Sequence, residues 1–223
     1  MSFLKEELSP FVPVALEAGA GVPWEDPTLP RLVGFYRTLW EVLRRPGEFF
    51  GRLRGPGWAE PLAFGLITAT LGLLASLYWH LLLAVVAQGL AGESGVVEKG
   101  TALTLMLLVP GMALAHLGWG SLCLWGAVAL LGVKTPFNPV WRIFCYAQGS
   151  MAAALIPLLG GLIAAVWMLF LIFRGVQRVF GVTAGRAVGA LFLSLLLQTL
   201  IFLFFVGSLT ALLGLIWLRL FFG

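Results

Sequence analysis

The chain has 223 residues, of which 60% are hydrophobic and 11% charged, with a mean hydropathy of +0.99. A soluble domain of this length needs more polar surface, so the composition excludes an ordinary soluble fold and predicts an integral membrane protein. The net charge of +4 comes mainly from arginines in a few short segments. Such clusters face an anionic membrane surface more often than a nucleic acid, and we expect no nucleic-acid partner.

Catalytic and metal-binding residues are scarce. From Lys99 to Gly223 there is not one Asp or Glu, so this part offers no carboxylate for a metal, a proton relay or general base catalysis. The two cysteines, Cys123 and Cys145, lie in apolar runs and are interpreted as buried thiols. No HExxH or GxSxG motif is present. We therefore expect neither an enzyme, nor a metal site, nor a cofactor.

Residues 1–30 form the first predicted region. They are rich in charged residues and in proline, and they contain no apolar core of the kind that a signal peptide requires. The prolines predict an extended or disordered, solvated tail.

Residues 31–58 form the second region, which we expect on the cytoplasmic side. From Arg31 to Arg45 apolar residues recur at helical spacing, Pro46-Gly47 breaks this helix, and a short element follows from Glu48 to Arg54. Arginines beside aromatic residues are typical of a helix in the lipid headgroup layer, but the same helix could instead pack on the protein's own cytoplasmic face. The expected contacts with anionic headgroups or with a cytoplasmic protein partner are Arg44, Arg45, Arg52 and Arg54.

Residues 59–223 are predicted to form an all-α membrane domain. Long charge-free runs indicate spans at about 61–88, 103–131, 139–157, 158–179 and 184–218. The run from Ile143 to Phe173 could be one helix, or two helices with a break at Pro157 and Gly160-Gly161. One helix would place Arg174 and Lys134 on opposite sides of the membrane, against the positive-inside rule, so two spans are favoured.

The resulting topology has five spans, with the N-terminus in the cytoplasm and the C-terminus outside. All but two of the 14 Lys and Arg residues then lie on the cytoplasmic side, the exceptions being Lys99 and Arg219. We expect this orientation in a bacterial plasma (inner) membrane.

Several short motifs carry a family resemblance between Leu39 and Leu200. They are Arg45-Pro46-Gly47-Glu48-Phe49-Phe50, Pro61-Leu62-Ala63-Phe64, Tyr146, Ile156-Pro157-Leu158-Leu159-Gly160-Gly161, Trp167, Arg174-Gly175-Val176 and the small residues from Thr183 to Ala187. This layout resembles the Yip-type (Ypt/Rab-interacting protein) membrane family, in its prokaryotic branch.

The resemblance implies five spans and a cytoplasmic N-terminus. It also implies a role like that of the eukaryotic members, which are adaptors for small GTPases and for membrane trafficking or shaping. Their Asp-Leu-x-Gly-Pro motif is echoed by Arg52-Leu53-Arg54-Gly55-Pro56, which lacks the Asp. The zinc ribbon of many prokaryotic relatives has no counterpart, because the cysteines that would build it are missing.

Four polar side chains in the predicted spans are further candidates: His80, His116, Tyr146 and Gln148. A polar group in hydrocarbon usually faces another helix or a water-filled cavity. For His116, an interhelical hydrogen bond is favoured over a proton or substrate role. Small residues recur at four-residue spacing in several spans; most of these faces should pack within the chain, and any face left over would join copies in a homo-oligomer.

Two functions remain open. The first is a non-enzymatic membrane scaffold whose basic cytoplasmic helix organises lipid or a partner. The alternative is a small, oligomeric transporter or channel that uses the broken hairpin at Pro157–Gly161 as a gate or binding turn.

Overall fold

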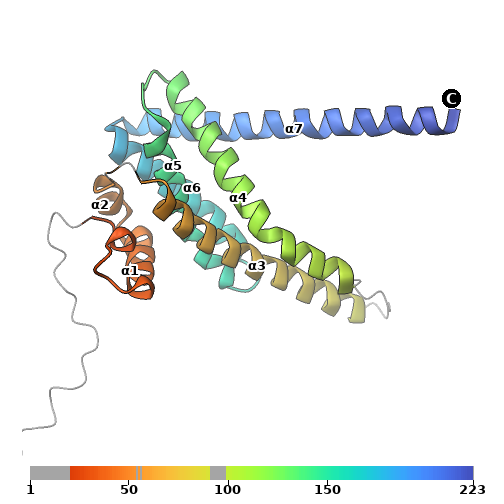
Figure 1. Ribbon diagram of the computed structural model, residues 1–223, viewed down its shortest axis with the longest axis horizontal. Coiled ribbons are helices and arrows are strands. Elements are labelled where there is room, and N and C mark those ends of the chain that lie inside the picture. The colour runs from red at the N-terminus through yellow and green to blue at the C-terminus, as the bar shows by residue number, and fades with distance from the viewer. Residues whose placement is uncertain (1–20, 54, 56, 91–98, 223) are drawn as a thin grey trace, which may run out of the picture.

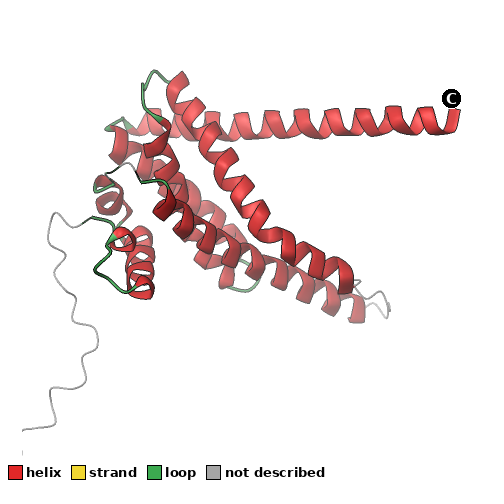
Figure 2. Cartoon of the chain, in the orientation of Figure 1, coloured by secondary structure: helices red, strands yellow, loops and turns green. Residues whose placement is uncertain are grey.

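The computed structural model describes residues 21–53, 55, 57–90 and 99–222, and within these ranges the chain contains only helices and loops (Figures 1 and 2). The elements are, in chain order, η1 (Pro23–Glu25), α1 (Arg31–Arg44), α2 (Pro46–Gly51), α3 (Ala59–Leu90), α4 (Lys99–Leu130), α5 (Phe137–Ala147), η2 (Gln148–Leu155), α6 (Gly160–Phe180) and α7 (Ala184–Phe222), where η marks a 3-10 helix.

Among the described residues, four helices are long and apolar enough to cross a membrane. They comprise Ala59–Leu90, Met106–Leu130, Gly160–Phe180 and Ala184–Val206. Each corresponds to one of the charge-free runs in the sequence, and a run of about 20 apolar residues suffices to cross the hydrocarbon core. The chain is therefore an all-helical integral membrane protein.

The span expected at 139–157 has a different form. Here α5 is an α-helix of 11 residues, and the chain then tightens into the 3-10 helix η2, of eight residues. This segment packs between α3 and α6, and glycines permit the close approach. A Cβ atom at Gly72 of α3 would lie 2.6 Å from Met151 Cβ, and one at Gly160 of α6 would lie 2.4 Å from Ala153 O. That α5 and η2 form a fifth span stays a prediction.

A tight turn follows η2, and α6 then runs back alongside it. Residues 156–159 make this turn, and Leu158 adopts a left-handed backbone conformation with φ of 65°. The turn coincides with the break expected at Pro157, and it returns the C-terminal end of α6 to the end of the bundle where α2 and α5 begin (Figure 1).

Helix α7 leaves the bundle. Its first turns pack on α4 and α6, and its remainder runs away from the other helices toward the C-terminus (Figure 1). At 39 residues it is about 58 Å long. Most of the exposed side chains on its free part are apolar, including Phe202, Phe204 and Phe205, as expected for a surface in contact with lipid.

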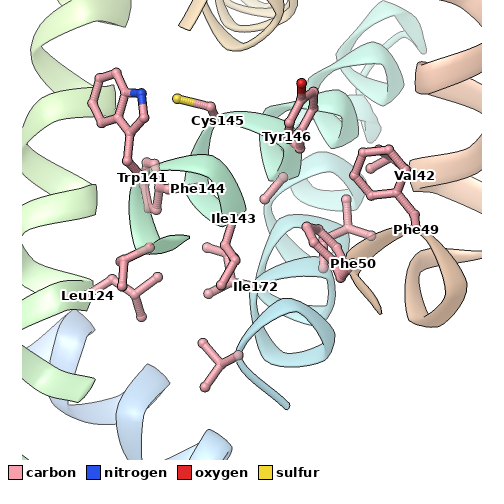
Figure 3. Packing of buried hydrophobic residues seen from close by; sticks show 14 of the residues in the cluster. Val42, Phe49, Phe50, Leu124, Trp141, Ile143, Phe144, Cys145, Tyr146 and Ile172 are labelled. Carbon is pink, nitrogen blue, oxygen red and sulfur yellow. The ribbon is translucent and has the colours of Figure 1, made fainter. Parts of the chain in front are cut away.

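The core is centred on α5. Every residue from Val140 to Ala147 is buried. Figure 3 shows Phe144 and Tyr146 among side chains of the surrounding helices, with Phe49 and Phe50 contributed by α2. The N-terminal helices are therefore an integral part of the packed core.

The end of the N-terminal region differs from the solvated tail that its prolines predict. Val22 and Trp24 are only 4% and 8% exposed, and residues 23–25 form the 3-10 turn η1 on the surface of α1 and α3. Tail residues 1–20 lie outside the described residues.

Candidate functional site: a buried polar cluster and the outer face of α1

A buried polar cluster joins the N-terminal segment to α5. The Arg142 guanidinium donates through Nη2 to both carboxylate oxygens of Glu25, at 2.7 and 2.9 Å, and through Nη1 to Gly57 O at 3.2 Å. Tyr146, one helical turn after Arg142, donates its hydroxyl to Glu25 Oε1. The Arg142 side chain is 3% exposed and Tyr146 is fully buried. The cluster thus places a charge pair inside the fold.

Local contacts hold Glu25 in this position. The backbone N–H of Trp24 donates to Thr38 Oγ1 at 2.8 Å, and its indole Nε1 donates to Glu60 O at 2.7 Å. Gly34 of α1 permits the close approach, because a Cβ atom there would lie 2.7 Å from Pro23 O. The segment is therefore fixed against both α1 and the start of α3.

The turn between η1 and α1 is closed by a side chain. Thr28 donates to Asp26 Oδ1 through its N–H at 2.9 Å and through its hydroxyl at 2.6 Å. These two hydrogen bonds favour the ionised carboxylate and lower the pKa of Asp26.

The chemistry available to the cluster is that of a structural link. A guanidinium, a carboxylate and a phenol joined by hydrogen bonds can hold two segments together, and removing either charged member leaves the other as an uncompensated charge. Across the described part of the chain, no group of three His, Cys, Asp or Glu side chains is placed to hold a metal ion.

The second feature is the outer face of α1, defined as Leu32, Val33, Tyr36, Arg37, Trp40 and Arg44. All six side chains are exposed, Leu32 by 73%, Tyr36 by 67% and Trp40 by 58%. The Arg44 guanidinium lies over the Trp40 ring, 3.7 Å from its centroid. The opposite face of α1 is buried through Gly34, Thr38, Glu41 and Val42. The helix thus packs on the protein and also exposes aromatic and basic groups.

The arginines expected at lipid headgroups have separate environments. Arg52 pairs with the buried Glu41 at 2.6 Å, and Arg45 lies 3.8 Å from Glu48. Arg44 belongs to the outer face of α1, and Arg54 lies outside the described residues.

The intramembrane candidates are likewise dispersed. The His116 ring is half-buried against Phe144, with their centroids 5.4 Å apart. His80 is exposed, with Nδ1 2.7 Å from Ser76 O in its own helix. Gln148 is 1% exposed and its Nε2 has no hydrogen-bond partner. Only Tyr146 is part of the buried cluster.

A small cavity lies between α4, α5, α6 and α7. Its volume is about 30 Å³, room for about one water molecule, and Ser194 and Gln198 line it, the Gln198 amide donating to Ser194 Oγ at 3.2 Å. Residues 156–161 of the broken hairpin do not line it.

Sequence reasoning missed Glu25 and Arg142 as partners. Glu25 was assigned to the solvated tail and Arg142 to the cytoplasmic side of the membrane. One local signal was available, because Arg142 and Tyr146 are four residues apart and so share a face of the helix predicted to start near Pro139. Their acidic partner is 117 residues away from Arg142, beyond the reach of local patterns.

The comparisons with known proteins agree with the resemblance drawn from the motifs. The family model of the Yip1 domain matches residues 40–207, which include α2 to α6 and the packed part of α7. No curated protein and no solved structure matches the chain. The matched region covers most of the sequence, and the chain therefore belongs to the Yip1 domain family.

Proposed function

We propose that this protein is a non-enzymatic membrane organiser that uses the outer face of α1 to engage the anionic headgroup layer of its membrane. The observation that carries the proposal is the combination of exposed Tyr36 and Trp40 with Arg37 and Arg44 on one helical face. Aromatic rings favour the boundary between headgroups and hydrocarbon, and arginines add electrostatic attraction to anionic lipids.

The attachment of α1 to the bundle supports this role. Its opposite face packs on the core, and the Arg31–Glu60 ion pair, 3.1 Å long, links its first residue to the start of α3. A rigidly attached helix would impose its orientation on the lipid beside the first membrane-spanning helix. This is how a scaffold could shape the bilayer without a catalytic step.

The wider setting belongs to the same proposal. The N-terminus and α1 lie in the cytoplasm, the C-terminus lies outside, and the membrane is the bacterial plasma membrane, as the distribution of Lys and Arg favours. The free part of α7 would adjoin lipid or a second copy of the chain. In this setting the outer face of α1 meets the leaflet that carries anionic lipids.

The test uses the full-length protein in lipid nanodiscs, with an environment-sensitive fluorophore on a cysteine at Tyr36→Cys. In discs containing phosphatidylglycerol the probe should report a less polar environment than in phosphatidylcholine discs, and Arg37→Gln with Arg44→Gln should abolish the difference. A probe at Glu48→Cys, exposed but outside α1, is the matched control. If position 36 reports an aqueous environment in both lipids, the proposed lipid contact is wrong.

A further inference from the structure

The C-terminal part of α6 carries two arginines for which the described residues supply no carboxylate. The four glutamates in the described ranges each pair with a different arginine: Glu25 with Arg142, Glu41 with Arg52, Glu48 with Arg45 and Glu60 with Arg31. None of these ion pairs includes Arg174 or Arg178. An excess of positive charge is therefore concentrated at this end of α6.

The two guanidinium groups converge on one place, the backbone of Gly47 at the start of α2. The position of a Cβ atom on Gly47 lies 3.5 Å from Arg178 Nε and 3.6 Å from Arg178 Nη2, and 3.9 Å from Arg174 Nη2. A single position at Gly47 is thus within van der Waals distance of both guanidinium groups. Two like charges four residues apart on a helix repel each other, so their convergence calls for a compensating anion.

The burial of Arg174 strengthens this argument. Its Nε is buried without a hydrogen-bond partner among the described residues, and its other contacts are weak: Nη1 lies 3.5 Å from Gln177 Oε1, and the guanidinium lies 5.8 Å from the Phe170 ring centroid. The carbonyl end of α6 offers only about half an elementary charge to offset two full cations. The described residues thus leave the pair incompletely compensated.

We propose that Arg174 and Arg178 form a binding site for a phosphate group at Gly47, one that a phospholipid headgroup or a free phosphate could occupy. Arginine forks bind phosphate oxygens with paired, charge-assisted hydrogen bonds. The site lies on α6 and α2, separate from the outer face of α1. Its occupancy therefore does not depend on the proposed function of α1.

The experiment measures lipid and phosphate binding by the full-length protein in detergent. Native mass spectrometry quantifies bound phosphatidylglycerol, and thermal unfolding with and without inorganic phosphate measures binding of the free ion. The variants are Arg174→Gln with Arg178→Gln, and a matched control, Lys134→Gln with Arg186→Gln. The control removes the same charge from two exposed residues elsewhere.

We expect the dissociation constant for the occupying group to rise at least about tenfold in the α6 variant, and to stay near the wild-type value in the control. Lost lipid binding identifies a headgroup site, whereas a lost phosphate-induced rise in melting temperature identifies a free-phosphate site. Should the double variant fail to fold, the single variant Arg178→Gln tests the proposal. Arg178 is exposed, so this substitution should leave the fold intact and still weaken binding of the phosphate group. Equal binding of both ligands by all variants would overturn the proposal.

Discussion

The region around α5 and the free part of α7 are built in contrasting ways. Around α5, continuous burial from Val140 to Ser150 is combined with the Glu25–Arg142 ion pair. Along the free part of α7 most of the described side chains are apolar but exposed, Leu203 by 58% and Phe204 by 72%. The first region derives its stability from specific contacts within the chain, and the second from the lipid around it. The two regions should therefore respond differently to the same kind of substitution.

The largest effect is expected from Arg142→Ala. The substitution leaves the Glu25 carboxylate and the Gly57 carbonyl without the guanidinium that donates to them, and breaking a buried ion pair costs about 3–5 kcal/mol. The loss should appear in the free energy of unfolding, measured by denaturant titration in detergent micelles. Arg37→Ala, on the exposed face of α1, is the control and should change stability by less than about 0.5 kcal/mol. Equal effects of the two substitutions would contradict a stabilising role for the cluster.

A somewhat smaller effect is expected when a leucine of α4 is truncated, and it should depend on position. Leu117 is fully buried, whereas Leu107 on the same helix is 73% exposed. Leu117→Ala should lower the free energy of unfolding by about 2–5 kcal/mol because it leaves a cavity. Leu107→Ala should cost less than about 0.5 kcal/mol, since lipid fills the vacated space. The same unfolding titration compares them, and a large cost at Leu107 would mean that this surface is covered by protein.

The smallest effect concerns the close contact between α3 and η2. Gly72→Ala would place a Cβ 2.6 Å from Met151 Cβ and 2.7 Å from Met151 O, an overpacking that costs about 1–3 kcal/mol. At Gly118 nothing lies within 4 Å of the new Cβ. Both substitutions gain helix propensity, so the difference between their melting temperatures isolates the clash. Gly72→Ala should melt lower than Gly118→Ala, and the opposite order would show that η2 shifts without cost.

The membrane helices could be predicted from the sequence because hydropathy is a local property. The absence of charge after Glu60 or Arg186 is enough to expect α3 and α7, and Gly160 with Pro157 marks the turn before α6. The change from α5 to a 3-10 helix at Gln148 could not be read in the same way. It accompanies the close packing of η2 against α3 and α6, which depends on tertiary contacts.

The candidate site was predictable only in part. Helical spacing predicted an amphipathic helix over α1, but it did not predict that Tyr36, Trp40 and Arg44 share one exposed face. Tyr146 was among the polar candidates, whereas its partner Glu25 was not. An ion pair between residues far apart in the sequence produces no recurring pattern of residues. In addition, the prolines near Glu25 favoured the prediction of a solvated segment.

The separation of 117 residues between Glu25 and Arg142 also has a consequence for biogenesis. At a translation rate of about 5–20 residues per second, Glu25 is synthesised roughly 6–23 s before Arg142. During this interval the Glu25 carboxylate has no Arg142 guanidinium with which to pair. The newly made N-terminal segment therefore lacks its ion pair with α5 until α5 has been synthesised. When Arg142 of α5 emerges, by contrast, the Glu25 carboxylate has already been synthesised and can neutralise its charge at once.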